Sequence, residues 1–128
     1  MKRKTRTITV DDKKYVWWCD LGMGYAIIKI SPFDDKTSVI TIEFPYVSNK
    51  NSSETEYEYI EEFPEYIIMN KDNKEYCIKI VEPKMVSLIL SYLSPENFIS
   101  RKSINYNGFD LLSQMGFTVC DIKLGWCW

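Results

Sequence analysis

An alternation that places apolar residues on one face of two neighbouring segments constrains this chain more than any other sequence feature. Residues 25–31 and 38–44 each place an apolar side chain at every second position, and residues 32–36 between them (PFDDK) favour a turn. Successive strand residues point to opposite faces of a sheet. The pattern therefore predicts an antiparallel hairpin with one buried face and one hydrated face. The side chains expected on the buried face are those of Ala26, Ile28, Ile30, Ile40, Ile42 and Phe44.

Two further stretches predict hairpins of the same kind. Residues 7–19 read as two strands around the polar turn 11–14, and the second of these strands is aromatic on both faces. Residues 65–80 read as two strands around the turn 71–74, with Tyr76, Ile78 and Ile80 expected to face the core.

The other strand-like segments are less regular. Residues 56–60 fit either an edge strand or an irregular loop, and residues 117–124 alternate weakly enough to predict only a short last strand. Residues 99–107 are mostly polar, so we expect a loop there.

The pattern changes from a period of two to a helical period after residue 82. Pro83 suits the first position of a helix, and residues 83–94 carry one apolar stripe and one polar stripe. The stripe expected to face the core consists of Val86, Ile89, Leu90 and Leu93. Residues 109–115 predict a second, short helix that Gly116 ends.

These elements predict an α+β fold: one antiparallel sheet of five to seven strands built from hairpins, with the helix at 83–94 packed on one face. A hydrophobic content of 45% and a charged content of 27% argue against disorder, and 128 residues fit a single domain spanning 1–128. The predicted core consists of Ile8, Val10, Ile28, Ile30, Ile40, Ile42, Phe44, Ile78, Ile80, Val86, Ile89, Leu90 and Leu93.

The sequence predicts a cytoplasmic protein without a membrane partner. The basic start is not followed by the apolar stretch of a secretory signal, and no apolar run is long enough to span a bilayer. The four cysteines fit reduced thiols and lack the close pairs of a zinc site, so we expect neither a metal nor a cofactor. They are Cys19, Cys77, Cys120 and Cys127.

The absence of histidine is the strongest sequence argument about activity. It removes the commonest general base and the Ser-His and Cys-His nucleophile pairs, so we expect no enzyme. The pairs Asp11-Asp12 and Asp34-Asp35 fall in predicted turns, where aspartate is favoured for its backbone geometry. The run Gly22-Met23-Gly24 is expected to be a bend between strands, because no helix follows it.

An acidic-aromatic segment, residues 52–66, is the best candidate for a binding site. It contains six glutamates and four aromatic residues and has no Lys or Arg. Carboxylates steer a basic partner, and tyrosines offer large contact areas. The alternative is a solvent-exposed edge strand whose charges only prevent aggregation with another sheet, which would have the same composition. The residues expected to bind are Glu54, Glu56, Tyr57, Glu58, Tyr59, Glu61 and Glu62, and the leading hypothesis is a small bacterial inhibitor of the immunity or antitoxin kind.

Two alternatives use other parts of the chain. A single-stranded nucleic-acid-binding accessory domain would combine basic residues at the start with aromatic residues, as such sites do. Its residues would be Lys2, Arg3, Lys4, Arg6, Trp17 and Trp18. A structural module would instead self-associate through Trp126 and Trp128, unless these tryptophans dock back onto the sheet.

The opening stretch Lys4-Thr5-Arg6-Thr7-Ile8-Thr9-Val10-Asp11-Asp12-Lys13-Lys14-Tyr15-Val16-Trp17 resembles a small family of uncharacterised bacterial proteins with an ITVD-type hairpin and a Tyr-x-Trp strand. The stretch Val81-Glu82-Pro83-Lys84-Met85-Val86 is similar to the Pro-led helix of that family. The resemblance covers about the first 45 residues and the helix. Asp12 stands where the family often has Gly, and the acidic insert at residues 48–62 is extra. The family has no assigned activity, so the resemblance implies a fold and no mechanism.

Overall fold

The computed structural model describes residues 5–22, 24–45 and 62–126 and shows an α+β fold. Over these residues, eight strands form a five-stranded sheet in the order β1-β2-β3-β4-β7 and a three-stranded sheet in the order β6-β5-β8. The expected antiparallel hairpins are present, but they are divided between two sheets. The strands are β1 (Arg6–Val10), β2 (Lys13–Gly22), β3 (Tyr25–Pro32), β4 (Val39–Pro45), β5 (Glu62–Lys71), β6 (Lys74–Lys79), β7 (Ser103–Asn107) and β8 (Thr118–Trp126).

All three predicted hairpins are confirmed, and two of them have tight two-residue turns. Asp11 and Asp12 join β1 to β2 with φ values of 51° and 64°, and Asp72 and Asn73 join β5 to β6 with φ values of 52° and 63°. Hairpin turns with two positive φ angles match the right-handed twist of the strands and favour Asn and Asp. The local turn chemistry and the apolar pattern therefore select the same register.

The prediction of a loop at residues 99–107 is confirmed for residues 99–102 and wrong for residues 103–107. Residues 103–107 form β7, which pairs in parallel with β4, so that Ile104 lies opposite Ile40 and Tyr106 opposite Ile42. Edge strands are short and polar on their hydrated face. Only Ile104 and Tyr106 carry the apolar signal of this strand, which is too little to identify it from the sequence.

Helix α1 (Pro83–Tyr92) begins with Pro83 at its first turn, as predicted, and buries its apolar stripe. Ser94 and Asn97 bracket a short 3₁₀ turn η2 (Pro95–Asn97), in which the Ser94 backbone N–H donates to Asn97 Oδ1 at 2.8 Å.

The second predicted helix is also present, as α2 (Gly108–Gln114). Asn107 Oδ1 caps it by accepting from the backbone N–H groups of Phe109 at 2.9 Å and Asp110 at 3.1 Å. Gly116, with φ of 96°, follows its end.

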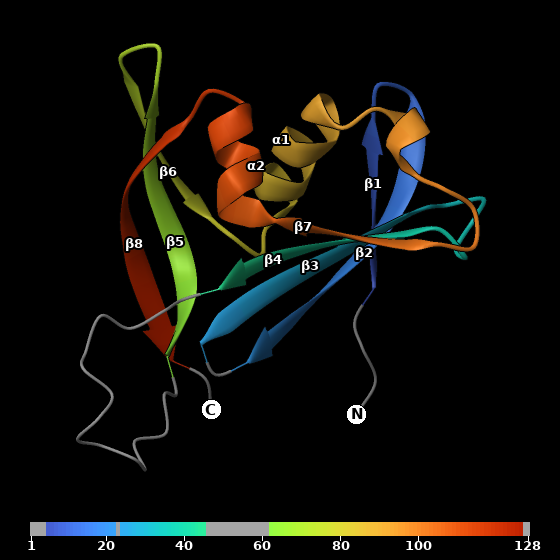
Figure 1. Ribbon diagram of the computed structural model, residues 1–128, viewed down its shortest axis with the longest axis horizontal. Coiled ribbons are helices and arrows are strands. Elements are labelled where there is room, and N and C mark those ends of the chain that lie inside the picture. The colour runs from blue at the N-terminus through green and yellow to red at the C-terminus, as the bar shows by residue number, and fades with distance from the viewer. Residues whose placement is uncertain (1–4, 23, 46–61, 127–128) are drawn as a thin grey trace.

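Both helices lie on the same side of the five-stranded sheet, with the three-stranded sheet standing at one end of it (Figure 1). Helix α1 contacts β1 and β6, and α2 contacts β4, β7 and β8. One hydrophobic core therefore joins both sheets and both helices. The other face of the five-stranded sheet carries no helix within the described residues.

The predicted core is largely confirmed. Ile8 and Val10 are half-buried against it, and the other predicted members are buried. Sequence reasoning missed a second group of buried residues, several of them on β2, β5 and α2: Tyr15, Trp17, Ala26, Ile67, Met69, Met85, Leu111, Leu112 and Phe117. Ala26 was placed on the buried face of its hairpin but was left out of the predicted core.

Candidate functional site

The acidic-aromatic segment lies mainly outside the residues that the structure describes. Six of the seven predicted partner-binding residues fall within residues 46–61: Glu54, Glu56, Tyr57, Glu58, Tyr59 and Glu61. The seventh, Glu62, is the first residue of β5. The fold therefore fixes the two points that this stretch connects, which are the end of β4 in one sheet and the start of β5 in the other.

Strand pairing brings together one residue from each of two separately predicted sites. Glu62 lies opposite Trp126 in the antiparallel pair of β5 and β8, and Pro64 lies opposite Leu124. The acidic-aromatic segment thus enters the three-stranded sheet beside the last described residue of the chain. Trp128 lies outside the described residues. The sequence alone separated these candidates, because β5 and β8 are distant along the chain.

The predicted nucleic-acid site is not assembled as expected. Lys2, Arg3 and Lys4 lie outside the described residues. Trp17 is only 1% exposed, so its ring belongs to the core and offers no surface to a base. It points inward because it pairs with Ile30 on the buried face of the sheet. Arg6 covers the same ring, with its guanidinium carbon 5.4 Å from the ring centroid.

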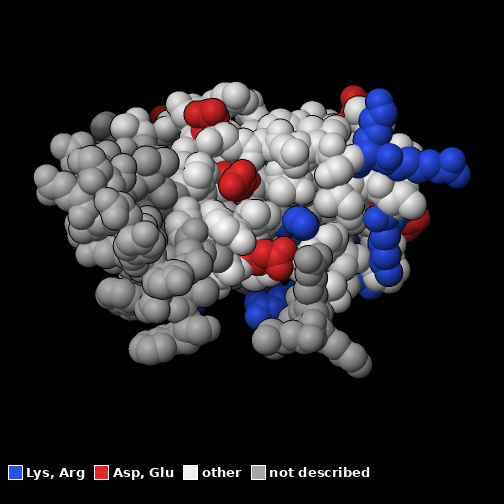
Figure 2. Space-filling view, turned by 60° about the horizontal axis from the view of Figure 1, so that its bottom comes forward, with Lys and Arg blue, Asp and Glu red and all other residues white. Residues whose placement is uncertain are grey.

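Trp18 points to the opposite, outer face of the five-stranded sheet. Its neighbour across the strands is Lys29, whose ammonium group lies 3.9 Å from an Asp20 carboxylate oxygen. The Trp18 ring is half-buried, and its Nε1 is covered and has no hydrogen-bond partner within the described part of the chain. Figure 2 looks toward this outer face and shows Asp and Glu side chains beside a cation in its middle and several Lys and Arg side chains at one end.

An aromatic residue that sequence reasoning missed lies at the basic end of this outer face. Phe33 is 44% exposed, and its backbone N–H donates to the Lys14 carbonyl at 3.0 Å, which extends the pairing of β2 and β3 by one residue. The Lys14 ammonium lies 4.2 Å from the Phe33 ring centroid and the Lys36 ammonium 5.3 Å from it. The sequence pattern of residues 32–36 predicts only a turn, and it gives no sign that Phe33 within this turn is exposed beside two lysines.

The turn after Phe33 is held by Asp35. Its Oδ1 accepts from the Thr37 hydroxyl at 2.5 Å and from the Thr37 backbone N–H at 3.2 Å. The Thr37 hydroxyl oxygen in turn accepts from the backbone N–H of Arg101 at 3.2 Å, which ties the turn before β7 to the turn before β4. The hydrogen bond from the Thr37 side chain, followed by one from Ser100, holds the pKa of Asp35 below its ordinary value of 3.8.

This pKa shift predicts an acid-sensitive contribution to stability. Because the folded-state pKa is lowered, the contribution is complete above pH 3.8 and is lost as the pH falls through the folded-state pKa. We expect Asp35→Asn to flatten the acid limb of the curve of unfolding free energy against pH. Urea titrations followed by circular dichroism between about pH 5 and about pH 2 measure this limb. Asp34→Asn, which leaves the Asp35 carboxylate in place, is the matched control, and an equal flattening in both variants would contradict the assignment.

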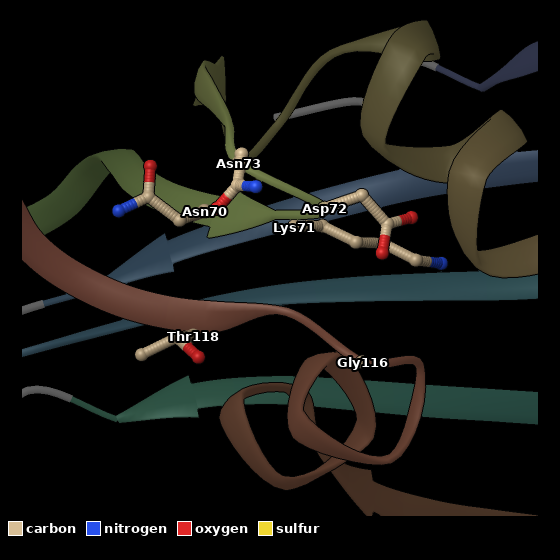
Figure 3. A pocket seen from close by; sticks show the side chains of 6 residues that line it. All are labelled: Asn70, Lys71, Asp72, Asn73, Gly116 and Thr118. Carbon is tan, nitrogen blue, oxygen red and sulfur yellow. The ribbon is translucent and has the colours of Figure 1, made fainter.

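A shallow polar pocket of about 440 Å³ lies where the β5–β6 turn approaches the start of β8. Its lining residues are Asn70, Lys71, Asp72, Asn73, Gly116 and Thr118. Figure 3 shows the Asn70 side chain pointing one way along the pocket and the Lys71 side chain the other. The Lys71 ammonium is engaged with the Phe117 ring, 5.0 Å from its centroid. The polar groups therefore do not converge on a common point, as a small-molecule site requires.

The described cysteines lie apart. Cys77 is on β6 and Cys120 is on β8, and β5 runs between these strands. Both are exposed, whereas Cys19 is half-buried and burial raises the pKa of its thiol. Within the described residues, no three His, Cys, Asp or Glu side chains come together as metal ligands would.

Comparison with known proteins finds no matching protein family, curated protein or solved structure. Among the described residues, no helix has the length and apolar character needed to cross a membrane.

Proposed function

We propose that this chain is a non-enzymatic, cytoplasmic binding protein that occupies a basic surface of a partner protein. In its most concrete form it is a small bacterial inhibitor of the immunity or antitoxin kind. The binding surface would consist of the acidic-aromatic segment and the adjoining end of the three-stranded sheet.

The composition of the segment supports a basic partner. Glu54, Glu56 and Glu58 alternate with Thr55 and Tyr57, without a compensating Lys or Arg from residue 52 to residue 66. An uncompensated group of carboxylates attracts a cationic surface over distances of about a Debye length, ~8–10 Å in physiological salt. Tyr57 and Tyr59 would then supply the apolar contact area, since tyrosine is enriched among residues that dominate binding energy.

The pairing of Glu62 with Trp126 is the observation that carries the proposal. It brings the backbone at the start of β5, where the acidic-aromatic segment ends, beside the backbone at the end of β8, so one binding surface could draw on residues from both. A surface that combines both is what a tight protein interface needs, because charged residues at the rim govern encounter and aromatic anchors govern dissociation. The lack of histidine in the chain supports a role that requires no general base of that kind.

Charge reversal tests the steering role. We expect Glu56→Lys/Glu58→Lys to slow association with the partner by about tenfold or more at low salt and to weaken its dependence on salt. The control Glu75→Lys/Glu96→Lys changes the net charge equally at two exposed positions elsewhere. Association rates measured by biolayer interferometry at several salt concentrations distinguish the effect of the two double variants. Equal slowing in both variants would mean that only net charge matters, and the segment would lose its assigned role.

A further inference from the structure

We propose that the outer face of the five-stranded sheet binds single-stranded nucleic acid at its basic end. The site consists of the Phe33 ring with Lys14 and Lys36 beside it, and of Trp18 with Lys29 farther along the same face. This site lies within the described residues and is independent of the acidic-aromatic segment.

The register of β2 and β3 places these side chains on one face. Val16 lies opposite Ser31 and Trp18 opposite Lys29, and the hydrogen bond from Phe33 to Lys14 continues the series. Tyr15 and Trp17, which alternate with them along β2, are buried in the core. Trp18 therefore stands on β2 and Phe33 directly follows the end of β3, separated by roughly four residues, or about 14 Å with the strand spacing included.

The sheet between the two rings is covered: Val16 is 8% exposed, Ser31 is fully buried, and Trp18 Nε1 is shielded from solvent. The aromatic area open to a ligand on this face is therefore mainly that of Phe33, which is 44% exposed. Both helices lie on the other face of this sheet (Figure 1). An exposed aromatic ring with cations beside it, at the edge of a sheet face that has its helices behind it, is an arrangement on which a base of a single strand can stack.

The cations beside the Phe33 ring suit a polyanion, and the carboxylates of Asp34 and Asp35 in the same turn partly offset them. Lys14 and Lys36 both lie within 6 Å of the Phe33 ring centroid, at 4.2 Å and 5.3 Å. The carboxylates of Asp20 and Glu43 belong to the opposite end, since both residues pair with Ile27. A single-stranded nucleic acid would therefore stack a base on the Phe33 ring. The ammonium groups of Lys14 and Lys36 would turn from the ring to the phosphates on either side of that base. Arg101, which is exposed and tied to the neighbouring Thr37, offsets the negative charge of Asp35 in the same turn.

The geometry distinguishes this site from one at the chain start. Trp17 is unavailable, so Arg6 and Trp17 form an internal contact that covers the core rather than a stacking platform. Phe33, by contrast, keeps nearly half of its surface exposed while two cations flank it. Exposed aromatic area surrounded by cations is suited to bases joined by phosphates.

Fluorescence anisotropy with labelled dT15 and rU15 at low salt tests the proposal on the full chain. We expect binding whose logarithm falls with the logarithm of salt concentration with a slope of about −2, since each of three contacted phosphates contributes roughly 0.7 on a single strand. Phe33→Ala should weaken binding about 5- to 150-fold, the range for loss of one stacked base. Lys14→Gln/Lys36→Gln should reduce the slope by about 1.4.

Matched controls use exposed residues away from this face. Tyr92→Ala removes an exposed aromatic ring from α1, and Lys74→Gln/Lys84→Gln removes two exposed cations from the β5–β6 hairpin and α1. Thermal melts should show all of these variants folded. Absence of binding to both oligonucleotides, or equal loss in Tyr92→Ala and Phe33→Ala, overturns the proposal. Binding that survives Phe33→Ala but disappears in Lys2→Gln/Arg3→Gln/Lys4→Gln moves the site to the chain start. Retention by phosphatidylserine vesicles and by neither oligonucleotide also overturns it, in favour of an anionic membrane surface.

Discussion

Replacing Trp17 with alanine is expected to lower the free energy of unfolding by about 3–5 kcal/mol. Trp17 is 1% exposed and lies opposite Ile30 in the centre of the sheet face that both helices cover. Its removal leaves a large cavity that neighbouring strands cannot fill without losing their register. Since the whole domain is stabilised by only about 5–15 kcal/mol, this variant should be close to unfolding at 37 °C.

Urea titration followed by far-ultraviolet circular dichroism measures this effect without relying on the removed fluorophore. Trp18→Ala is the matched control, because the neighbouring tryptophan is half-buried on the outer face of the same strand. We expect it to lose clearly less stability. Equal losses in the two variants would contradict the assignment of the two faces of β2. The comparison also matters for binding studies, because any loss of ligand by Trp17→Ala would reflect unfolding.

Replacing Gly108 with alanine is expected to destabilise the protein by about 1–3 kcal/mol, although the same change inside a helix is ordinarily stabilising. A Cβ atom at Gly108 would lie 2.6 Å from Cδ1 of Phe44 and still closer to two other atoms of its ring. The ring cannot easily move away, because Phe44 is fully buried and packs edge-on against Phe109 with 5.3 Å between ring centroids. The glycine is therefore required by close packing of α2 on β4.

A double-mutant cycle with Phe44→Leu isolates this contact. Phe44→Leu alone should be destabilising, but combined with Gly108→Ala it should cost less than the sum of the single changes, since the smaller side chain makes room for the methyl group. Ser113→Ala, at an exposed position of the same helix, should leave stability within about 0.5 kcal/mol. Strict additivity, or a stabilising Gly108→Ala, would show that the α2–β4 contact is not as close as described.

The hairpins could be predicted because their information is local. In β3 and β4 the apolar alternation and the turn between them agree, and every residue assigned to their buried face is buried. Helix α1 was identified for the same reason, since Pro83 and the apolar stripe lie within one short stretch. The division into two sheets and the parallel pairing of β7 with β4 depend on contacts between distant segments, which no local pattern specifies.

The candidate sites also combine features that the local sequence predicts with features that depend on contacts between distant segments. Composition alone identified the acidic-aromatic segment and the C-terminal tryptophans, but only the pairing of β5 with β8 shows that the backbones of Glu62 and Trp126 are neighbours. Trp17 and Trp18 are adjacent and chemically alike, so the sequence does not predict which of the two is buried in the core. Phe33 was overlooked because turn-forming neighbours surround it, and its two lysines come from β2 and from the turn after it.

Affinity capture of tagged protein from its native lysate, with and without nuclease and read by mass spectrometry, tests the central claim most directly. We predict one stoichiometric partner protein with a basic surface that is retained after nuclease treatment. It should be absent from captures with Glu56→Lys/Glu58→Lys and present with Glu75→Lys/Glu96→Lys. A partner retained equally by both variants, or no protein that survives nuclease treatment, would contradict a protein-binding role for the acidic-aromatic segment.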